Sequence, residues 1–237
     1  MLQKLKEDLK KLATPQRAKV SASFFKTGKG QYGEGDIFIG VTVPDTRKIA
    51  KNYLQLELPQ ITILLESPVH EHRLIALLIL VERFKKADDK IKTEIYKFYL
   101  KHTKYVNNWD LVDLSAHYIV GSYLFEKDKA MLYKLVKSNN LWERRIAIIA
   151  TFAFIRKNKF QDTFKIAELL LQDKHDLMHK AVGWMLREVG KKDQRALETF
   201  LKQHYKIMPR TMLRYAVERF DEKKRKEYMQ KSKSKNA

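Results

Sequence analysis

A short polar and aromatic segment, Asn-Asn-Trp-Asp-Leu-Val-Asp, begins at Asn107. Asn107 or Asn108 can cap a helix, and Asp110 then falls in the first turn, where the helix dipole favours a negative charge. Asp113 follows Trp109 by four residues and therefore lies on the same helix face, one turn later. A carboxylate beside an indole and apolar neighbours is either a structural acid or one that takes part in a reaction.

The charge of the chain indicates a polyanionic partner. Its 237 residues include 48 Lys and Arg against 28 Asp and Glu, which gives a net charge of +20 and a pI of about 9.8. Nucleic acid is the first candidate and an anionic membrane surface the second. The alternative is a soluble basic protein with no such partner, because charge governs association and not fold.

Several classes of protein are excluded by what the sequence lacks. With no cysteine, it has no disulfide, Cys-ligated zinc, iron–sulfur cluster or thiol nucleophile. The seven histidines are scattered, so we expect no metal and no cofactor. The amino terminus has no signal-type apolar core, and no run approaches 18 apolar residues. We therefore expect a cytoplasmic protein that does not enter a membrane.

Helical spacing of apolar residues dominates the chain, and no strand period stands out. Thr42 is the nearest residue that can cap the helix starting near Pro44. A short apolar run at 37–41 is a candidate extended segment. Helices are expected near 2–13, 15–25, 44–55, 59–66, 70–85, 88–102, 108–123, 127–137, 141–156, 160–171, 175–190, 192–204 and 209–219.

Four of the eight glycines lie in residues 27–36, and three of them have the spacing of a dinucleotide-binding loop. We reject that function because the fingerprint requires a preceding strand, whereas the segment before this loop has a helical pattern. The loop is either a long connection after the second helix or a flexible segment whose amides and Lys29 contact phosphate.

A repeat of about 35 residues runs through the helices. Three similar segments align when Arg73 is placed under Arg144 and His179, in steps of 71 and 35 residues, and the missing member then falls near Trp109. Each unit contains a long helix and a shorter one. This period predicts an all-α, curved α-solenoid of HEAT-like helical pairs, whose concave face is a binding surface. We expect one repeat domain at 1–220 and a flexible basic tail at 221–237, with seven Lys or Arg against three acids.

The alignment also predicts which side chains share a face. Relative to Trp109 and its equivalents, Arg145 stands at plus one, Asp113 at plus four and Trp184 at plus five. At roughly 100° per residue these positions cover about 140° of the helix surface. We therefore expect two indoles, one acid and one guanidinium to converge on one stripe. The alternative is that the indoles are core residues, Asp113 a cap and Arg145 a structural ion.

Five segments resemble the bacterial DNA alkylation repair family typified by AlkD. They are SFFKTGKGQYGEGD at 23–36, VPDTRK at 43–48, NWDLVD at 108–113, LWERR at 141–145 and KAVGWMLRE at 180–188. The likeness extends over nearly the whole chain, from about residue 2 to residue 220. The last segment is the most specific of the five.

The resemblance implies a monofunctional glycosylase that removes cationic alkylated purines, such as 3-alkyladenine and 7-alkylguanine, from duplex DNA in base excision repair. Asp113 matches the catalytic aspartate of the family. Trp109 and Trp184 match the tryptophans that contact the lesion's deoxyribose, and Arg145 matches the arginine that holds the backbone nearby. The further aromatic contact is a tyrosine in the family and falls on about Phe24 here, without the hydroxyl.

These residue types suit that reaction. A cationic purine departs as a neutral base, while positive charge builds on the sugar. An ionised Asp113 can stabilise that charge or orient water, and indole faces can assist through cation–π attraction. Arg145, Arg187 and Lys29 are the candidates for contact with phosphate. No metal is needed, and we expect a monomer that acts on duplex DNA.

Two other functions fit the same pattern. A non-catalytic DNA-binding solenoid would recognise damaged or branched DNA, with salt-sensitive binding and no base release. A protein scaffold would use the groove for a peptide. Full DNA affinity after charge reversal at Arg145 and Arg187 would count against both nucleic-acid functions. The glycosylase is favoured because a scaffold has no need of an acid between two tryptophans.

Overall fold

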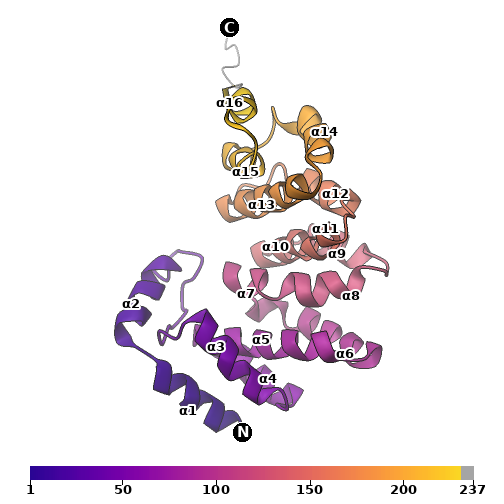
Figure 1. Cartoon of the computed structure of the whole chain (residues 1–237). Coiled ribbons are helices and arrows are strands. Elements are labelled where there is room, and N and C mark those ends of the chain that lie inside the picture. Colours follow the sequence, from indigo (N-terminus) through magenta and orange to yellow (C-terminus); the bar gives the residue numbers. More distant parts are fainter. Residues whose placement is uncertain (231–237) are drawn as a thin grey trace. The chain divides into compact units, whose positions relative to one another are not determined.

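The computed structural model describes residues 1–230, and these residues form an all-α chain (Figure 1). Within that range the only β contact is an isolated parallel bridge between Ile37 and Val69. The predicted all-α class is therefore confirmed, and it is consistent with a helical-repeat solenoid. No helix within residues 1–230 has both the length and the apolar character needed to cross a bilayer.

The chain divides into two compact units, Met1–Ile119 and Val120–Ala237. We call them unit 1 and unit 2, and each has its own central helix. The single repeat domain at 1–220 stays a prediction.

Unit 1 is built around one long helix, α5 (His70–Lys86), which contacts α3, α4, α6 and α7 and lies beside α3 and α4 in Figure 1. Twelve of its 17 residues are buried. A helix buried on nearly all sides is a core helix. The other helices of unit 1 are α1 (Leu2–Leu12), α2 (Pro15–Phe24), α3 (Val43–Ala50), α4 (Leu58–Leu65), α6 (Asp89–Lys101) and α7 (Trp109–Asp113), with 3-10 turns at Lys51–Tyr53 and Thr103–Tyr105.

Helix α2 differs from the others in unit 1 because none of its residues is buried. It is attached near its start, where Thr14 N donates to Ile39 O at 3.1 Å. Gly40 has a φ of +82°, and a Cβ there would lie 2.2 Å from the Thr14 carbonyl oxygen. Only glycine therefore allows this loop to approach α2 so closely. The attachment leaves Val20 and Phe24 more than 60% exposed, at 62% and 63%.

Unit 2 is organised by α13 (Asp176–Lys192), which contacts α10, α11, α12, α14 and α15. Gly183 on α13 allows α15 to approach, because a Cβ there would lie 2.5 Å from Met212 O and from Tyr215 Cβ. The remaining helices of unit 2 are α8 (Ser122–Leu124), α9 (Ala130–Leu135), α10 (Leu141–Ala150), α11 (Phe152–Arg156), α12 (Gln161–Leu169), α14 (Gln194–His204), α15 (Arg210–Ala216) and α16 (Glu222–Gln230).

Two predicted helices are broken by hydroxyl side chains. The helix expected near 108–123 ends as α7 at Asp113 and continues through a π-helical turn at His117–Gly121. Ser115 Oγ donates to Leu111 O at 2.5 Å in the break. In the helix expected near 141–156, Thr151 Oγ1 donates to Ile148 O at 2.7 Å between α10 and α11. Such bonds back to the preceding turn compete with the helical pattern and bend it.

Part of the basic tail predicted at 221–237 is helical, because Glu222–Gln230 forms α16, and the flexibility of the tail stays a prediction. Tyr228 packs edge-on against Phe220 and Tyr205, at centroid distances of 5.8 and 5.5 Å. Lys224 Nζ also pairs with Glu198 at 2.6 Å. These aromatic contacts attach one face of α16 to the preceding helices, whereas the basic composition of the segment predicted no such contact. The rest of the predicted tail, 231–237, lies outside the described residues.

Gly183→Ala is expected to destabilise the protein by about 2 kcal/mol, because the new methyl group would overlap a backbone carbonyl that cannot rotate away. Gly190→Ala is the matched control on α13. Its methyl would meet only the flexible end of Leu197, and the gain in helix propensity offsets that contact. Denaturant unfolding of both variants measures the difference. Equal stability of the two variants would contradict the close approach of α13 and α15.

Candidate functional site

The predicted catalytic acid Asp113 and the predicted sugar contact Trp109 both lie on α7, a helix of only five residues. Asn108 caps it, and its Oδ1 accepts from Trp109 N at 2.8 Å, which confirms one of the two predicted caps. Asp113 is the last helical residue and is half-buried. So short a helix has little stability of its own, so its direction depends on what holds it.

Trp109 belongs to a column of stacked rings that we call the aromatic column: Trp109, Phe25 and Phe38. Trp109 stacks on Phe25 with a centroid distance of 5.0 Å and an angle of 15°. Phe25 stacks on Phe38 at 5.0 Å, and Phe38 stacks on the His70 ring at 4.5 Å. Phe24 meets the edge of Trp109 at 5.8 Å and is itself 63% exposed. The indole is thus fixed at one end of a rigid stack, beside an accessible phenyl ring.

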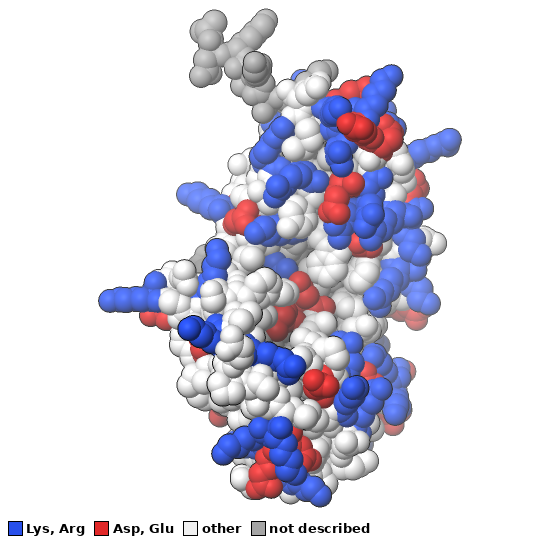
Figure 2. Space-filling view, turned by 60° about the vertical axis from the view of Figure 1, so that its left-hand side comes forward, with Lys and Arg blue, Asp and Glu red and all other residues white. Residues whose placement is uncertain are grey.

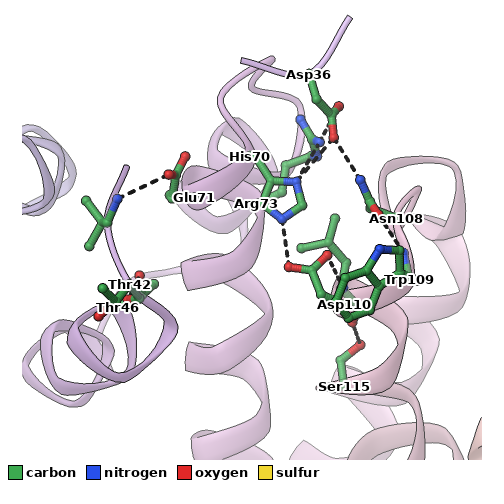
Figure 3. A network of polar contacts seen from close by, with 12 residues as sticks. Asp36, Thr42, Thr46, His70, Glu71, Arg73, Asn108, Trp109, Asp110 and Ser115 are labelled. Carbon is green, nitrogen blue, oxygen red and sulfur yellow. Dashed lines mark hydrogen bonds and ion pairs between the residues drawn. The ribbon is translucent and has the colours of Figure 1, made fainter. Parts of the chain in front are cut away.

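A buried polar cluster adjoins this column at His70, on whose ring Phe38 stacks, and Figure 3 shows the cluster. We define it as Asp36, His70, Arg73 and Asp110. His70 Nε2 is 2.8 Å from Asp110 Oδ2, and Nδ1 is 3.2 Å from Asp36 Oδ2. Arg73 Nη2 donates to the other Asp36 oxygen at 2.6 Å. All four side chains are less than 8% exposed, at 6%, 2%, 4% and 7% respectively. The cluster therefore joins the loop before α3 to the first turns of α5 and α7.

Electrostatics favour the charged form of His70. Burial by itself lowers the pKa of His70, but the hydrogen bonds to Asp110 and Asp36 outweigh it and raise the pKa to about 9. Burial likewise raises the pKa of Asp36. The bond from His70 and the charge of Arg73 reverse that effect, and they hold the Asp36 pKa below its ordinary value. Two cations thus balance two carboxylates inside the cluster.

Glu71, the neighbour of His70, holds the same loop by its backbone. Its Oε1 accepts from Gly40 N at 2.8 Å, and its two oxygens lie 3.1 and 3.2 Å from Ile39 N. Val41 N lies 3.3 Å from Oε1. A carboxylate that receives several amides is strongly anchored. Since Gly40 and Ile39 also contact the start of α2, Glu71 fixes the loop on which the helix carrying Phe24 rests.

A pair of hydrogen-bonded hydroxyl groups, from Tyr99 and Ser115, lies at the break after α7. Tyr99 on α6 lies 2.9 Å from Ser115 Oγ, which itself bonds to Leu111 O. Burial and the nearby negative charge of Asp113 raise the pKa of Tyr99 well above its usual value. The phenol therefore stays neutral, and the Asp113 carboxylate lies within electrostatic range of it.

Unit 2 contains three predicted site residues, and each makes contacts within the protein. They are Arg145, Trp184 and Arg187. Arg145 is only 5% exposed, and its Nη1 donates to Leu177 O at 2.6 Å. Trp184 is half-buried, and its Nε1 donates to Glu188 at 3.1 Å. Arg187 bonds to Glu218 and lies 3.6 Å from Glu188. Their roles at DNA stay predictions, as does the convergence of these residues with Trp109 and Asp113.

Lys29 is exposed in the glycine-rich loop, where its neighbour Gly30 donates to Glu34 Oε2 at 2.7 Å. The segment before that loop is helix α2, in agreement with our rejection of a dinucleotide fingerprint. Its predicted contact with phosphate stays a prediction. Across residues 1–230, no three His, Asp or Glu side chains gather in a way that could hold a metal ion.

Sequence reasoning missed the buried cluster. Asp110 was assigned only to the helix dipole, and Arg73 only to the repeat. Asp36 ends one of the family-like segments without a role, and His70 lies in none of the motifs. The one available signal was that Asp36 ends the glycine-rich loop and Asp110 begins a helix, but their common partner His70 lies 34 and 40 residues away from them.

Together these features describe an all-α protein with an accessible aromatic edge and a buried ionic cluster in unit 1. The chain belongs to the DNA alkylation repair enzyme family, whose model matches residues 5–220. The predicted family resemblance is thereby confirmed. No match to a curated protein sequence was found.

Two solved structures share the fold. One is described as a predicted DNA alkylation repair enzyme from Enterococcus faecalis, with a TM-score of 0.69 and 17% identity over 89% of this chain and 97% of that one. The other is AlkD2 from Streptococcus mutans, with a TM-score of 0.56 and 18% identity over 93% and 97% of the two chains. At this identity the likeness concerns the fold alone.

Family membership supports a role in the repair of alkylated DNA and implies DNA as a partner. The surface is suited to a polyanion. On the face shown in Figure 2, Lys and Arg side chains stand out over much of the area, with fewer Asp and Glu among them. The excess agrees with the net charge of +20.

The charged form of His70 is expected to make stability depend on pH. Because its pKa rises from 6.5 to about 9 on folding, its contribution is complete below pH 6.5 and is lost as the pH rises through 9. The difference in free energy of unfolding between wild type and His70→Gln should therefore shrink by up to about 3 kcal/mol across that range. Denaturant unfolding at several pH values measures it.

His72→Gln is the control for this measurement. His72 is also on α5, and burial lowers its pKa to about 4, so the folded protein keeps it neutral. Its contribution changes only between pH 4 and 6.5, and the control should show no slope from pH 7 to 9.5. A constant difference between wild type and His70→Gln from pH 6 to 9.5 would show that His70 is neutral in the folded protein.

Proposed function

We propose that this protein is a monofunctional DNA glycosylase that releases cationic alkylated purines, including 3-alkyladenine and 7-alkylguanine, from duplex DNA. The observation that carries the proposal is the arrangement on α7. Asp113 stands one turn after an indole that is fixed in the aromatic column, beside the exposed ring of Phe24. An acid and an aromatic edge side by side suit a sugar that becomes positively charged.

The reaction follows from the charge of the lesion. Cleavage of the glycosidic bond transfers the bonding electrons to the alkylated base, which leaves neutral, while the deoxyribose becomes cationic. The Asp113 carboxylate would stabilise that cation and orient the water that attacks it. As the new C–O bond forms, the water would give its proton to the Asp113 carboxylate, which would then release it to solvent. The Trp109 face would pack on the sugar edge and add cation–π attraction.

The surrounding charges would position the DNA. Exposed Lys29 is available for a phosphate contact. Arg187 would exchange Glu218 for a phosphate, because that carboxylate now occupies its guanidinium. Arg145 is bonded to the start of α13, so we propose that it orders the backbone there as well as facing the DNA. Trp184 would be the second indole at the lesion nucleotide. We propose that the protein works as a monomer and without a cofactor.

Asp113→Asn is expected to reduce single-turnover release of methylated purines from methylated duplex DNA by about 10²- to 10³-fold, since one charge that stabilises the transition state is lost. DNA affinity should change by no more than a few-fold. Asp89→Asn, which removes an exposed acid from the same unit, is the matched control and should keep the wild-type rate. Wild-type turnover in Asp113→Asn would remove Asp113 from the mechanism. No release by wild type, with DNA binding intact, would favour a non-catalytic reader of damaged or branched DNA.

Phe24→Ala is expected to lower base release or lesion affinity about tenfold, because one aromatic contact with a nucleotide contributes roughly 1–3 kcal/mol. Stability should hardly change, since the ring is 63% exposed. Val20→Ala, one turn earlier on α2 and 62% exposed, is the control. Phe24→Tyr should retain activity. Equal rates for Phe24→Ala and Val20→Ala would exclude Phe24 from the contact surface.

A further inference from the structure

His70 links two segments that carry the aromatic side chains of the proposed site. Through Asp36 it bonds the loop between α2 and α3, which holds Phe25 and Phe38. Through Asp110 it bonds the first turn of α7, which holds Trp109. Both bonds come from one ring at the start of α5, and Figure 3 shows that ring between the two carboxylates. This inference rests on the proposed function in that it concerns the same site.

Only the doubly protonated ring can make both bonds as a donor. A neutral imidazole carries one N–H, and a carboxylate offers only acceptors. With distances of 3.2 and 2.8 Å to Asp36 and Asp110, each ring nitrogen therefore needs its own proton. Loss of one proton would leave either Asp36 or Asp110 without its bond from His70, with the carboxylate facing a lone pair of the ring, although Asp36 would keep its bonds from Arg73 and Asn108. Such a group is costly to keep buried, so the neutral ring could hold the loop or α7 but not both.

Asp36, one of the two carboxylates that His70 bonds, also contacts the residue that caps Trp109. Asn108 Nδ2 donates to Asp36 Oδ2 at 3.2 Å, while its Oδ1 caps Trp109 N. The indole stacks on Phe25, which belongs to the loop segment. Release of either carboxylate would thus shift α7 against the loop and disturb the stack. Arg73, the other charged group facing His70, bonds Asp36 and Ser67 O and does not reach α7 by any of these contacts.

We propose that His70 is a positioning residue: its charged ring fastens the aromatic loop to α7, and it thereby seats Trp109 and directs Asp113 toward the lesion sugar. It does not touch the substrate. It acts through Asp36 and Asp110, whose backbones lead directly to the stacked rings and to the acid. Without the bridge, α7 keeps its cap and the bond from Asn108 to Asp36 but loses the contact that holds Asp110 in its first turn.

The test uses the full chain with 5-fluorotryptophan and fluorine NMR. The protein has three tryptophans, so three signals are expected, and Trp109→Phe assigns the one of interest. Between pH 7 and 10.5 the Trp109 signal should move with a midpoint near the His70 pKa of about 9. Trp142 and Trp184 are internal references and should stay in place. Tyr99, the phenol closest to Asp113, has a pKa raised above this range by burial.

Two variants and one control decide the assignment. His70→Gln should abolish the transition and leave the Trp109 signal at its high-pH position at pH 7. Asp36→Asn, which keeps an acceptor but removes a charge, should move the midpoint down by about one pH unit or more. His72→Gln should behave as wild type. A Trp109 signal that does not move in wild type, or that moves equally in His70→Gln, overturns the proposal. If His70→Gln does not fold, an unshifted midpoint in Asp36→Asn overturns it.

Single-turnover base release under saturating protein adds a catalytic measurement. His70→Gln should lower the rate constant at pH 7 about tenfold or more, with DNA affinity changed less than threefold, because the residue orients groups and does not bind DNA. An unchanged rate constant overturns the inference while leaving the proposed glycosylase intact. No release by wild type overturns the proposed function, and the fluorine signal of Trp109 then still decides the role of His70.

Discussion

The imidazolium ring of His70, bonded to two buried carboxylates, is the contact on which the site in unit 1 depends. Ions are costly to bury unless they are paired and hydrogen-bonded. Here two acids meet two bases, and the four side chains are drawn from three separate segments. The glycine-rich loop, the core helix α5 and the short helix α7 therefore have to come together at once. A cluster that satisfies its charges only in one arrangement specifies that arrangement.

This cluster explains how so small an element as α7 can carry a predicted catalytic acid. Five residues cannot form a stable helix alone. The cap from Asn108, the bond from His70 to Asp110 and the Ser115 contact beneath it supply the missing constraints. The helix ends at Asp113, and Ser115 Oγ bonds back to Leu111 O just before the π-helical turn at His117–Gly121.

Periodicity was enough to predict most of the helices of this chain, and single caps such as Thr42 and Asn108 were correctly located because capping is a local property. Three features of the fold were not predicted from the sequence. The breaks at Ser115 and Thr151 depend on hydroxyl rotamers, and α16 depends on Tyr228 meeting distant rings. The buried cluster pairs residues up to 40 positions apart, for which a single sequence holds no spacing rule. Asp113 and the two tryptophans were singled out by their spacing in the repeat, the family resemblance implied their roles, and those roles stay predictions.

The absence of buried residues in α2 has a consequence for dynamics. Hydrogen-exchange protection follows local burial, so α2, which has no buried residue, is expected to open more readily than α5, which has twelve. Opening of α2 exposes almost no new apolar surface, so it costs little and does not propagate into the core. The segment that carries Phe24 is therefore expected to exchange its amide protons faster than the core helix α5. The two helices thus differ in how readily they open: α2 opens at low cost, and α5 is held by its buried residues.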